Sequence, residues 1–420
     1  MKTICIFEDE GYANLLPLTY TKPVFELKCG VSSLFEKIKN CYGHIVCDLL
    51  CREYLKETVK HKHPALMVEK ITTSSCCLFI NGRIIMNSDI AKHIPVEGPD
   101  EIFMCKGQIA AVRLNKNSID EVKDSLNGII EKSFWDLIMP RLKSTEVQAR
   151  FIKYYFDLVH QNAQLIAEEF DNLTKQSKLS DKKFDGVYLI NKKRITICEG
   201  AAIKPNVVLD AEAGPIFIGK GVTIMSGSTI IGPVFIGEKS IIKAGAKIYG
   251  GTSIGEMCKV GGEVEGSIIQ SYSNKQHDGF MGHSYIGQWV NWGAGTNNSD
   301  LKNNYTNVKV TINGEMIDSG HMFVGLCMAD HSKCAINTMF NTGTVVGVAS
   351  NIFGSNFPPK YVPSFSWGGT GNITVYDIKK AKQVAQKVLE RRKIEFTKAD
   401  SSLFDCIFEA TIKEREKFGI

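Results

Sequence analysis

Two histidines, His277 and His283, lie in the stretch "SNKQHDGFMGHSYIGQWVNWGAGTNN", which runs from Ser273 to Asn298. The stretch is rich in glycine and has no helical periodicity. An imidazole titrates close to neutral pH, so it can act as a general base. A histidine in a polar turn can also simply hydrogen-bond that turn. Residue types alone leave both roles open for His277, whereas His283 is expected to face a turn.

The surrounding sequence repeats with a period of six. Of the 37 glycines, 28 lie between Gly200 and Gly371, which excludes a helical domain because glycine disfavours helices. Aliphatic residues recur every six positions at Ile218, Ile224, Ile230, Ile236, Ile242, Ile248, Ile254 and Val260. This period matches neither a helix nor a simple strand, but it is typical of a solenoid of short strands and turns. A β-sandwich with frequent turns is the alternative that the unbroken repeat disfavours.

Four segments follow from these patterns. Residues 1–143 alternate strand-like runs, such as "KTICIF" and "CCLFING", with amphipathic helical runs, which predicts an α/β domain with a mainly parallel sheet. Residues 144–185 are predicted to form a linker helix, capped by Ser144 or Thr145, and a polar loop. Residues 186–371 form the predicted β-solenoid, interrupted by an excursion from Asn297 to Met322. Residues 372–420 return to helix and are expected to cap the solenoid.

Composition excludes several classes of protein. The net charge of +5 on 420 residues is weak and no basic run resembles a nucleic-acid-binding arm, so we expect no nucleic acid. No apolar stretch of about 18 residues exists, so we expect no membrane span. The 13 cysteines have no metal-binding spacing, and the short apolar run at Met1–Phe7 leads us to expect no signal peptide. They are expected to be reduced, buried thiols of a cytoplasmic protein.

The pattern H-x-x-F-M-G-x-S-x-I-G-x-x-V-N-W-G-A-G-T, which begins at His277, resembles the bifunctional N-acetylglucosamine-1-phosphate uridylyltransferase/glucosamine-1-phosphate N-acetyltransferase family. The resemblance implies a left-handed β-helix, acetyl-CoA as cosubstrate and a homotrimer. It makes His277 the general base, Asn291 a sugar contact, and the backbone at Ala294 and Gly295 the cofactor-binding turn. Lys275 is a candidate cation for the sugar phosphate. Phe280 stands where the family often has tyrosine.

Two further parts of the sequence carry this resemblance. In the excursion, Tyr305 of "NNY" is aligned with the family's Asn-Tyr pair and is a candidate substrate contact. Near the N-terminus, "LLPLTYTKPVFEL" and "CCLFINGRI" resemble sugar nucleotidylyltransferases and make Lys22, Asn81 and Arg83 candidate substrate-binding residues.

The N-terminal segment also departs from that family. Its glycine-rich phosphate loop is replaced by "EDEGYANLLP", whose acids would repel phosphate, and Arg83 stands where the family has a Mg²⁺-binding aspartate. Arginine cannot bind Mg²⁺, so the ligands of any Mg²⁺ used in nucleotidyl transfer stay unidentified.

The resulting hypothesis is a transferase with two activities. It would acetylate glucosamine 1-phosphate and then join the product to UTP, giving UDP-N-acetylglucosamine. Its partners would be a sugar phosphate, acetyl-CoA and a nucleoside triphosphate. Two alternatives stay open: a nucleotidylyltransferase for another sugar with the β-helix as trimerisation scaffold, and a sugar-nucleotide sensor without catalytic activity.

Overall fold

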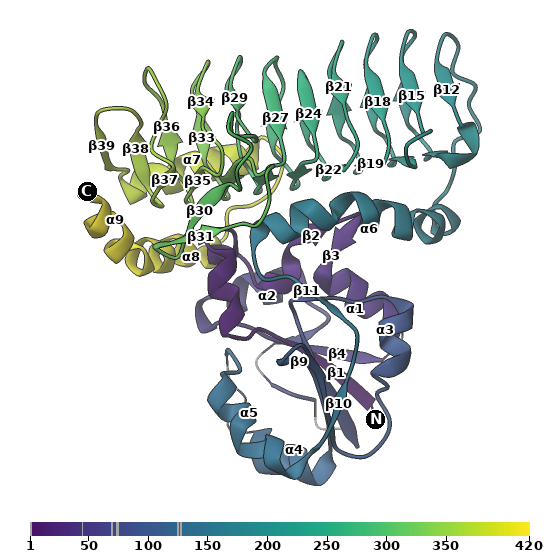
Figure 1. The fold of residues 1–420 in the computed structure, drawn as a ribbon, viewed down its shortest axis with the longest axis vertical. Coiled ribbons are helices and arrows are strands. Elements are labelled where there is room, and N and C mark those ends of the chain that lie inside the picture. Colours follow the sequence, from purple (N-terminus) through teal and green to yellow (C-terminus); the bar gives the residue numbers. More distant parts are fainter. Residues whose placement is uncertain (1, 44, 69, 73–74, 124–125, 127) are drawn as a thin grey trace. The chain divides into compact units, whose positions relative to one another are not determined.

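The computed structural model describes residues 2–43, 45–68, 70–72, 75–123, 126 and 128–420. The chain divides into two compact units (Figure 1). Unit 1 consists of Met1–Leu27, Ser32–Tyr154 and Thr397–Cys406, and unit 2 of Lys28–Val31, Tyr155–Phe396 and Ile407–Ile420.

Unit 1 is built on a seven-stranded sheet of order β10-β8-β9-β6-β1-β4-β5. The strands are β1 (Lys2–Phe7), β4 (Val46–Leu50), β5 (Met67–Val68), β6 (Cys76–Asn81), β8 (Glu101–Cys105), β9 (Gln108–Asn115) and β10 (Lys143–Glu146). Only β9 runs antiparallel to its neighbours. The prediction of a mainly parallel sheet is therefore confirmed. Three short strands, β3 (Ser32–Ser33), β7 (Ile84–Ile85) and β11 (Arg150–Phe151), lie outside this sheet.

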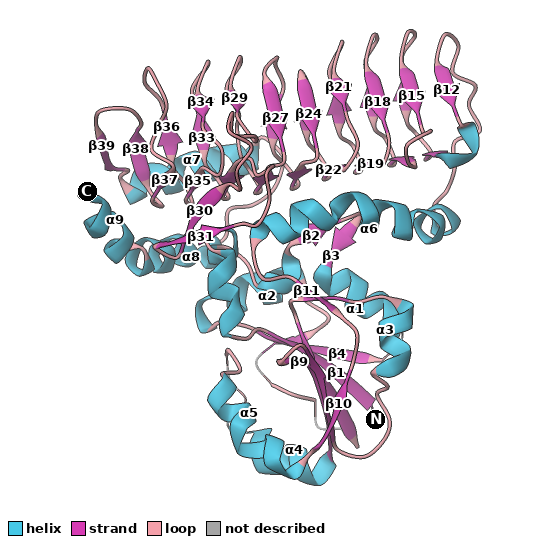
Figure 2. Ribbon diagram, in the orientation of Figure 1, coloured by secondary structure: helices cyan, strands magenta, loops and turns pink. Residues whose placement is uncertain are grey.

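Helices cover both faces of this sheet (Figure 2). They are α1 (Leu34–Tyr42), α2 (Lys56–Lys62), α3 (Ser88–His93), α4 (Lys116–Val122) and α5 (Lys132–Ile138). On one face, Ile119 of α4 and Trp135 of α5 join a buried cluster with Phe7 and Phe79 of the sheet. Helix α1 begins at a capping box, in which Ser33 and Glu36 bond each other's backbone N–H.

The predicted linker helix begins later than expected. Lys143–Glu146 forms β10, which pairs with β8 as an edge strand, and the helix α6 spans Tyr155–Gln176. The prediction that Ser144 or Thr145 caps a helix is thus wrong, because pairing with a sheet edge outweighs local helix preference. Nor is α6 a free linker: eight of its side chains are buried and it packs within unit 2.

Unit 2 contains a left-handed parallel β-helix, whose coils stack in a row in Figure 1. Its three faces are named after their first strands. The β12 face holds β12 (Tyr188–Ile190), β15 (Val208–Asp210), β18 (Thr229–Ile231), β21 (Lys247–Ile248), β24 (Glu263–Glu265) and β27 (Phe280–Gly282), followed by β29 (Asn297–Asn298) and β34 (Met339–Phe340). The β13 face holds β13 (Ile195–Ile197), β16 (Ile216–Ile218), β19 (Val234–Ile236), β22 (Thr252–Ile254), β25 (Ile268–Ile269), β28 (Tyr285–Ile286), β32 (Cys327–Met328), β35 (Val345–Val346) and β37 (Tyr361–Val362). The β14 face holds β14 (Ala202–Ile203), β17 (Thr223–Ile224), β20 (Ile241–Ile242), β23 (Lys259–Val260) and β26 (Asn274–Lys275), and continues with β33 (Lys333–Cys334), β36 (Asn351–Ile352), β38 (Ser366–Gly368) and β39 (Ile373–Val375).

The six-residue repeat forms the core of this β-helix. All eight aliphatic residues from Ile218 to Val260 are fully buried in one cluster. Along the β14 face, Thr223 pairs with Ile241 and Ile241 with Lys259, so these coils are 18 residues long. Lys259 then pairs with Asn274, so the next coil has 15 residues, and the repeat changes phase there.

The predicted excursion leaves the solenoid after β29. It contains a hairpin of β30 (Lys309–Ile312) and β31 (Glu315–Asp318), and the chain rejoins the β13 face at β32. The chain ends in three helices, α7 (Ile378–Glu390), α8 (Lys398–Ala410) and α9 (Ile412–Phe418). Within unit 2, Phe408 and Arg415 pack on Phe365 near the last coils, consistent with the expected capping. Among the described residues no helix has the length and hydropathy of a membrane span.

Candidate functional site

His277 lies at one corner of the β-helix, where the chain turns from the β14 face to the β12 face. We call the stacked turns at residues 276–279, 293–296 and 335–338 the 277 corner. The N–H of Gly295 donates to the carbonyl of Asp278 at 3.0 Å, and the N–H of Asn337 donates to the carbonyl of Ala294 at 2.7 Å. The turn that holds His277 and the turn that holds Ala294 are therefore neighbours on successive coils.

Two groups at this corner keep their hydrogen-bonding capacity. The side chain of His277 is exposed, and its ring has no hydrogen-bond partner within the described part of the chain. The backbone N–H of Ala294 likewise donates to no acceptor among the described residues. Gly295, at a φ of +67°, allows the sharp turn that leaves this N–H unused. The corner thus presents a free imidazole and a free amide on adjacent coils.

Lys275 fixes this corner from inside. Its side chain is buried in β26, and its ammonium donates to the carbonyls of Gly261 at 2.8 Å and His277 at 3.0 Å. Burial lowers the pKa of Lys275 to about 8, against the opposing charges of Asp278 and Glu263. The observed bonds position the turn, and a contact between Lys275 and substrate stays a prediction.

The other two predicted contacts of unit 2 differ in their placement. Asn291 is exposed and bridges Asn274 on one neighbouring coil and Lys333 on the other, so it belongs to the coil that leads into the Ala294 turn. Tyr305 lies in the excursion, with 68% of its surface exposed, and its N–H donates to the carbonyl of Lys302. The structure therefore places Asn291 on the coil that leads into the 277 corner, and Tyr305 in the excursion outside that corner.

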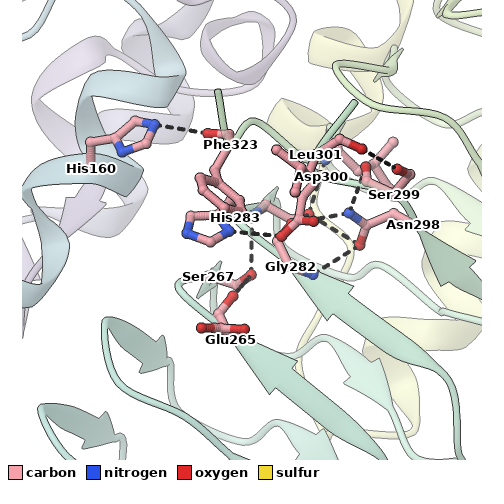
Figure 3. Close-up of polar contacts among 12 residues, drawn as sticks. His160, Glu265, Ser267, Gly282, His283, Asn298, Ser299, Asp300, Leu301 and Phe323 are labelled. Carbon is pink, nitrogen blue, oxygen red and sulfur yellow. Dashed lines mark hydrogen bonds and ion pairs between the residues drawn. The ribbon is translucent and has the colours of Figure 1, made fainter. Parts of the chain in front are cut away.

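His283 occupies a different corner, where the chain turns from the β12 face to the β13 face (Figure 3). Its Nδ1 lies 2.8 Å from a carboxylate oxygen of Asp300. The amide of Asn298 binds both backbone groups of Gly282, the residue before His283: its Oδ1 accepts from the N–H of Gly282, and its Nδ2 donates to the Gly282 carbonyl. An imidazole oriented by a carboxylate is an arrangement that acid–base catalysts use. Sequence reasoning missed it, since Asp300 is one coil away and gives no local signal.

Two more imidazoles lie beside His283. The ring of His160, on α6, stacks on the ring of His321 with centroids 3.8 Å apart, and lies 6.1 Å from the ring of His283. His160 Nε2 also lies 3.0 Å from the carbonyl oxygen of Phe323 (Figure 3). Burial, with the neighbouring His321 and His283, lowers the pKa of His160 to about 4. This cluster joins α6 to the excursion through stacked imidazole rings.

In unit 1 the predicted residues Asn81 and Arg83 converge on Asp9. The guanidinium of Arg83 forms a bidentate ion pair with Asp9, through Nε at 2.7 Å and Nη2 at 2.5 Å, and the amide of Asn81 donates to the same carboxylate at 2.8 Å. Burial tends to raise the pKa of Asp9, but the hydrogen bond and charge of Arg83 outweigh it and lower that pKa.

The neighbouring acid is neutralised too. Glu8 is fully buried and pairs with Arg52, whose Nε lies 3.1 Å from Oε2. The expectation that the acids of "EDEG" repel phosphate therefore fails for Glu8 and Asp9, because arginines distant in sequence neutralise them. Lys22 is buried beside this pair and its carbonyl accepts a hydrogen bond from Arg52 at 3.0 Å.

Mg²⁺ does not fit the residues at this place. Asp9 is the carboxylate beside Arg83, and both of its oxygens already accept hydrogen bonds from Arg83, Asn81 or Gly11. Within the described residues, no group of three or more His, Cys, Asp or Glu side chains is arranged to hold a metal ion. We therefore derive no catalytic step through Mg²⁺.

Comparison with known proteins bears on both units. Residues 4–178 match the sequence model of a family described as sugar nucleotidyl transferase. A segment of 91 residues is 33% identical to the bifunctional sugar-1-phosphate nucleotidylyltransferase/acetyltransferase of Sulfurisphaera tokodaii, over 22% of this chain and 23% of that protein. The chain thus spans less than a quarter of the length of this curated relative in the match. The family and the relative are both named as transferases.

Solved structures of two acyltransferases are also similar. Arabidopsis UDP-N-acetylglucosamine acyltransferase is 13% identical with a TM-score of 0.30, covering 56% of this chain and 91% of that chain. AntD, an N-acyltransferase from Bacillus cereus in complex with dTDP and 3-hydroxybutyryl-CoA, is 14% identical with a TM-score of 0.22, covering 53% of this chain and 96% of that chain.

Proposed function

We propose that the β-helix transfers an acetyl group from acetyl-CoA to the amine of glucosamine 1-phosphate, and that unit 1 joins the product to UTP. The second step would release pyrophosphate and form UDP-N-acetylglucosamine. The sugar nucleotidyl transferase match over residues 4–178 supports the second activity. The name of the Sulfurisphaera relative supports the pairing of nucleotidyl and acetyl transfer in one chain.

The 277 corner is the observation that carries the acetyl-transfer proposal. The amine of the sugar would attack the thioester carbonyl, forming a C–N bond while the C–S bond breaks. His277 would accept the proton that the amine loses and pass it to the departing thiolate of CoA, which leaves as free thiol. The N–H of Ala294, one coil away, would stabilise the negative charge that develops on the carbonyl oxygen.

The residues around His277 and Ala294 would position the turn and the sugar and would not touch the reacting atoms. Lys275 holds the carbonyl of His277, and Gly295 holds the carbonyl of Asp278, so both fix the turn that carries the base. Asn291 is exposed on the coil that leads to Ala294, where its amide would hydrogen-bond the sugar.

For unit 1, the proposed activity rests on the family match and on Arg83. Arg83 is buried and is held by Asp9, the carbonyl of Ile152 and the amide of Gln108. A guanidinium can bind phosphate through two parallel hydrogen bonds. We propose that phosphate competes with Asp9 for Arg83. Lys22, which is buried close to Arg52, would assist as a second cation.

We also propose that the protein assembles as a homotrimer through its β-helix. Ile336, in the 277 corner, exposes 69% of its surface, and Met339 on the adjoining strand β34 exposes 40%. Large apolar side chains of this kind at a regular corner are expected to be covered by another copy. Light scattering should give three times the mass of the 46.6 kDa chain, and a monomer mass would contradict the proposal.

The release of free thiol from acetyl-CoA tests the acetyl-transfer proposal. With glucosamine 1-phosphate as acceptor, His277→Ala should lower the rate by at least about 100-fold, the usual contribution of a general base. His283→Ala is the matched control, because this histidine lies one corner away on the same coil. Thiol release that persists in His277→Ala and is lost in His283→Ala would assign the base to the His283–Asp300 pair instead.

A further inference from the structure

A lysine-rich cleft lies at the first coil of the β-helix, within unit 2. It is formed by the end of α6, the segment 179–184, strand β12, the turn at Lys192–Arg194 and strand β13. In Figure 1 the end of α6 and β12 both lie at the same end of the row of coils. The cavity measures about 780 Å³, within the range of small-molecule sites.

The cleft concentrates positive charge. Its lining includes five lysines, Lys175, Lys182, Lys183, Lys192 and Lys193, against the two aspartates Asp171 and Asp181. Five minus two gives a net charge of +3, more than half of the +5 of the whole chain.

These lysines differ from their neighbours in lacking anionic partners. Beside the cleft, Lys178 and Lys220 share the carboxylate of Glu199, at 2.7 Å and 2.8 Å. Among the described residues, by contrast, the side-chain ammonium groups of the five cleft lysines form no hydrogen bond or ion pair. Uncompensated cations around a cavity attract a multiply charged anion.

The floor of the cleft is apolar. It includes Phe170, Phe184 and Leu189, and the last two pack against the core of the β-helix. Leu179, on the rim, exposes 54% of its surface. Arg194 lies over the ring of Phe170, 5.9 Å from its centroid. A ligand that fits both features has an apolar or aromatic body and several negative charges.

We propose that this cleft binds a small molecule in which an aromatic base carries several phosphates. A nucleoside triphosphate and coenzyme A share this chemistry. The lysine ammonium groups would act as point charges for the phosphates, and the base would lie on Phe184. The site is distinct from the 277 corner and from Arg83, so the proposal does not depend on the proposed function.

Lysine footprinting of the full chain tests the site directly. Acetylation of exposed lysines by a succinimidyl ester, followed by mass spectrometry, would be compared without ligand and with UTP, CoA or pyrophosphate. We expect UTP or CoA to protect Lys182, Lys183, Lys192 and Lys193 at least about threefold. Lys204, an exposed lysine elsewhere on the β-helix, serves as the internal control and should not change.

The pattern of protection identifies the ligand or overturns the proposal. Protection by UTP alone or by CoA alone would assign the cleft to that molecule. Equal protection by pyrophosphate at the same concentration would contradict a role for the apolar floor. Stronger protection by an oligonucleotide than by UTP or CoA would show a nucleic-acid surface instead. The absence of protection by any of them would rule the site out.

A charge-reversed variant gives a second, independent readout. In the double variant Lys182→Glu with Lys193→Glu, the ligand concentration that half-protects Lys183 and Lys192 should rise about tenfold. Lys204→Glu is the matched control and should leave that concentration unchanged. Acetyl-transfer and pyrophosphate-release rates measured on the same variants separate the two proposals. Loss of protection with both rates unchanged would confirm an additional site.

Discussion

The change Glu8→Gln tests how unit 1 tolerates an acidic sequence in place of a glycine-rich loop. Glu8 is fully buried, and Oε1 accepts from the N–H of Val24 at 2.8 Å and from Nη2 of Arg52 at 3.1 Å. Oε2 accepts from the N–H and the Nε of Arg52, at 3.2 Å and 3.1 Å. Glutamine keeps the volume but removes the charge, and its amide NH₂ would face donors of Arg52.

The expected cost follows from the burial of both partners. Arg52 is 4% exposed, so in the variant its charge would be left without a buried counter-ion. Breaking one partner of a buried ion pair costs about 3–5 kcal/mol. Because each 1.4 kcal/mol is a factor of ten, the opening equilibrium of unit 1 should rise by roughly two to three and a half orders of magnitude. Much of the stability of an ordinary domain, about 5–15 kcal/mol, would be lost.

Hydrogen exchange followed by mass spectrometry measures this effect without assuming that the whole chain unfolds in one step. Peptides from β1 and β4 should lose protection, while peptides from β19 and β22 in unit 2 provide an internal reference. Glu10→Gln, two residues away and exposed, is the control. Replacing the pair together, by Glu8→Leu with Arg52→Met, should restore much of the protection. Exchange in Glu8→Gln equal to that in Glu10→Gln would refute the reasoning.

Three further changes concern unit 2. Asn162→Ala removes a fully buried amide that hydrogen-bonds the N–H of Gly30 at 2.6 Å, the hydroxyl of Ser253 at 3.1 Å and the carbonyl of Gly251 at 2.7 Å. The free energy of opening should fall by about 2–4 kcal/mol, which would be measured as faster hydrogen exchange around α6. Gln164→Ala, at an exposed position of the same helix, is the control and should leave the exchange unchanged. Gly295→Ala would place a Cβ 2.0 Å from Oδ1 of Asn337 at a positive φ, whereas a Cβ at Gly245, which has a similar φ, would meet nothing within 4 Å. Gly295→Ala should therefore abolish acetyl transfer, while Gly245→Ala should keep most of this activity. Equal losses of activity in the two variants would exclude the clash as the cause. Acidification should loosen the contact between α6 and the excursion, because the folded pKa of His160 is about 4, below its ordinary value, so the folded state favours the neutral ring and loses stability as the pH drops from about 6.5 towards 4. Since this side chain is partly exposed, we expect a loss of about 1 kcal/mol in the free energy of opening. Hydrogen exchange in α6 that does not change over this pH range, or that changes equally in His160→Gln, would contradict this prediction.

Periodic features of the fold could be predicted from the sequence because each residue of the repeat has the same physical role. Ile218 to Val260 recur every six positions and all lie in the core. The period fails at the coil from Lys259 to Asn274, which is three residues shorter than its predecessors. The start of α6 could not be predicted from local sequence for a related reason, since the pairing of β10 with β8 depends on a strand about 40 residues earlier.

Site features could be predicted only where a local motif carried them. The motif around His277 and Ala294 led to two turns that are neighbours in the structure. The pairs Glu8–Arg52, Asp9–Arg83 and His283–Asp300 join residues 44, 74 and 17 positions apart. Such pairs leave no local pattern, and the charge of a short acidic segment alone gave the wrong expectation for phosphate.

The most direct test of the two-activity account is to supply the intermediate. Wild-type protein and His277→Ala would be given UTP with either glucosamine 1-phosphate plus acetyl-CoA or N-acetylglucosamine 1-phosphate, and UDP-N-acetylglucosamine would be quantified by mass spectrometry. The account predicts that the variant forms no product from the first mixture and forms it at the wild-type rate from the second. Product from the first mixture at the wild-type rate, or none from either mixture with the wild-type protein, would contradict it.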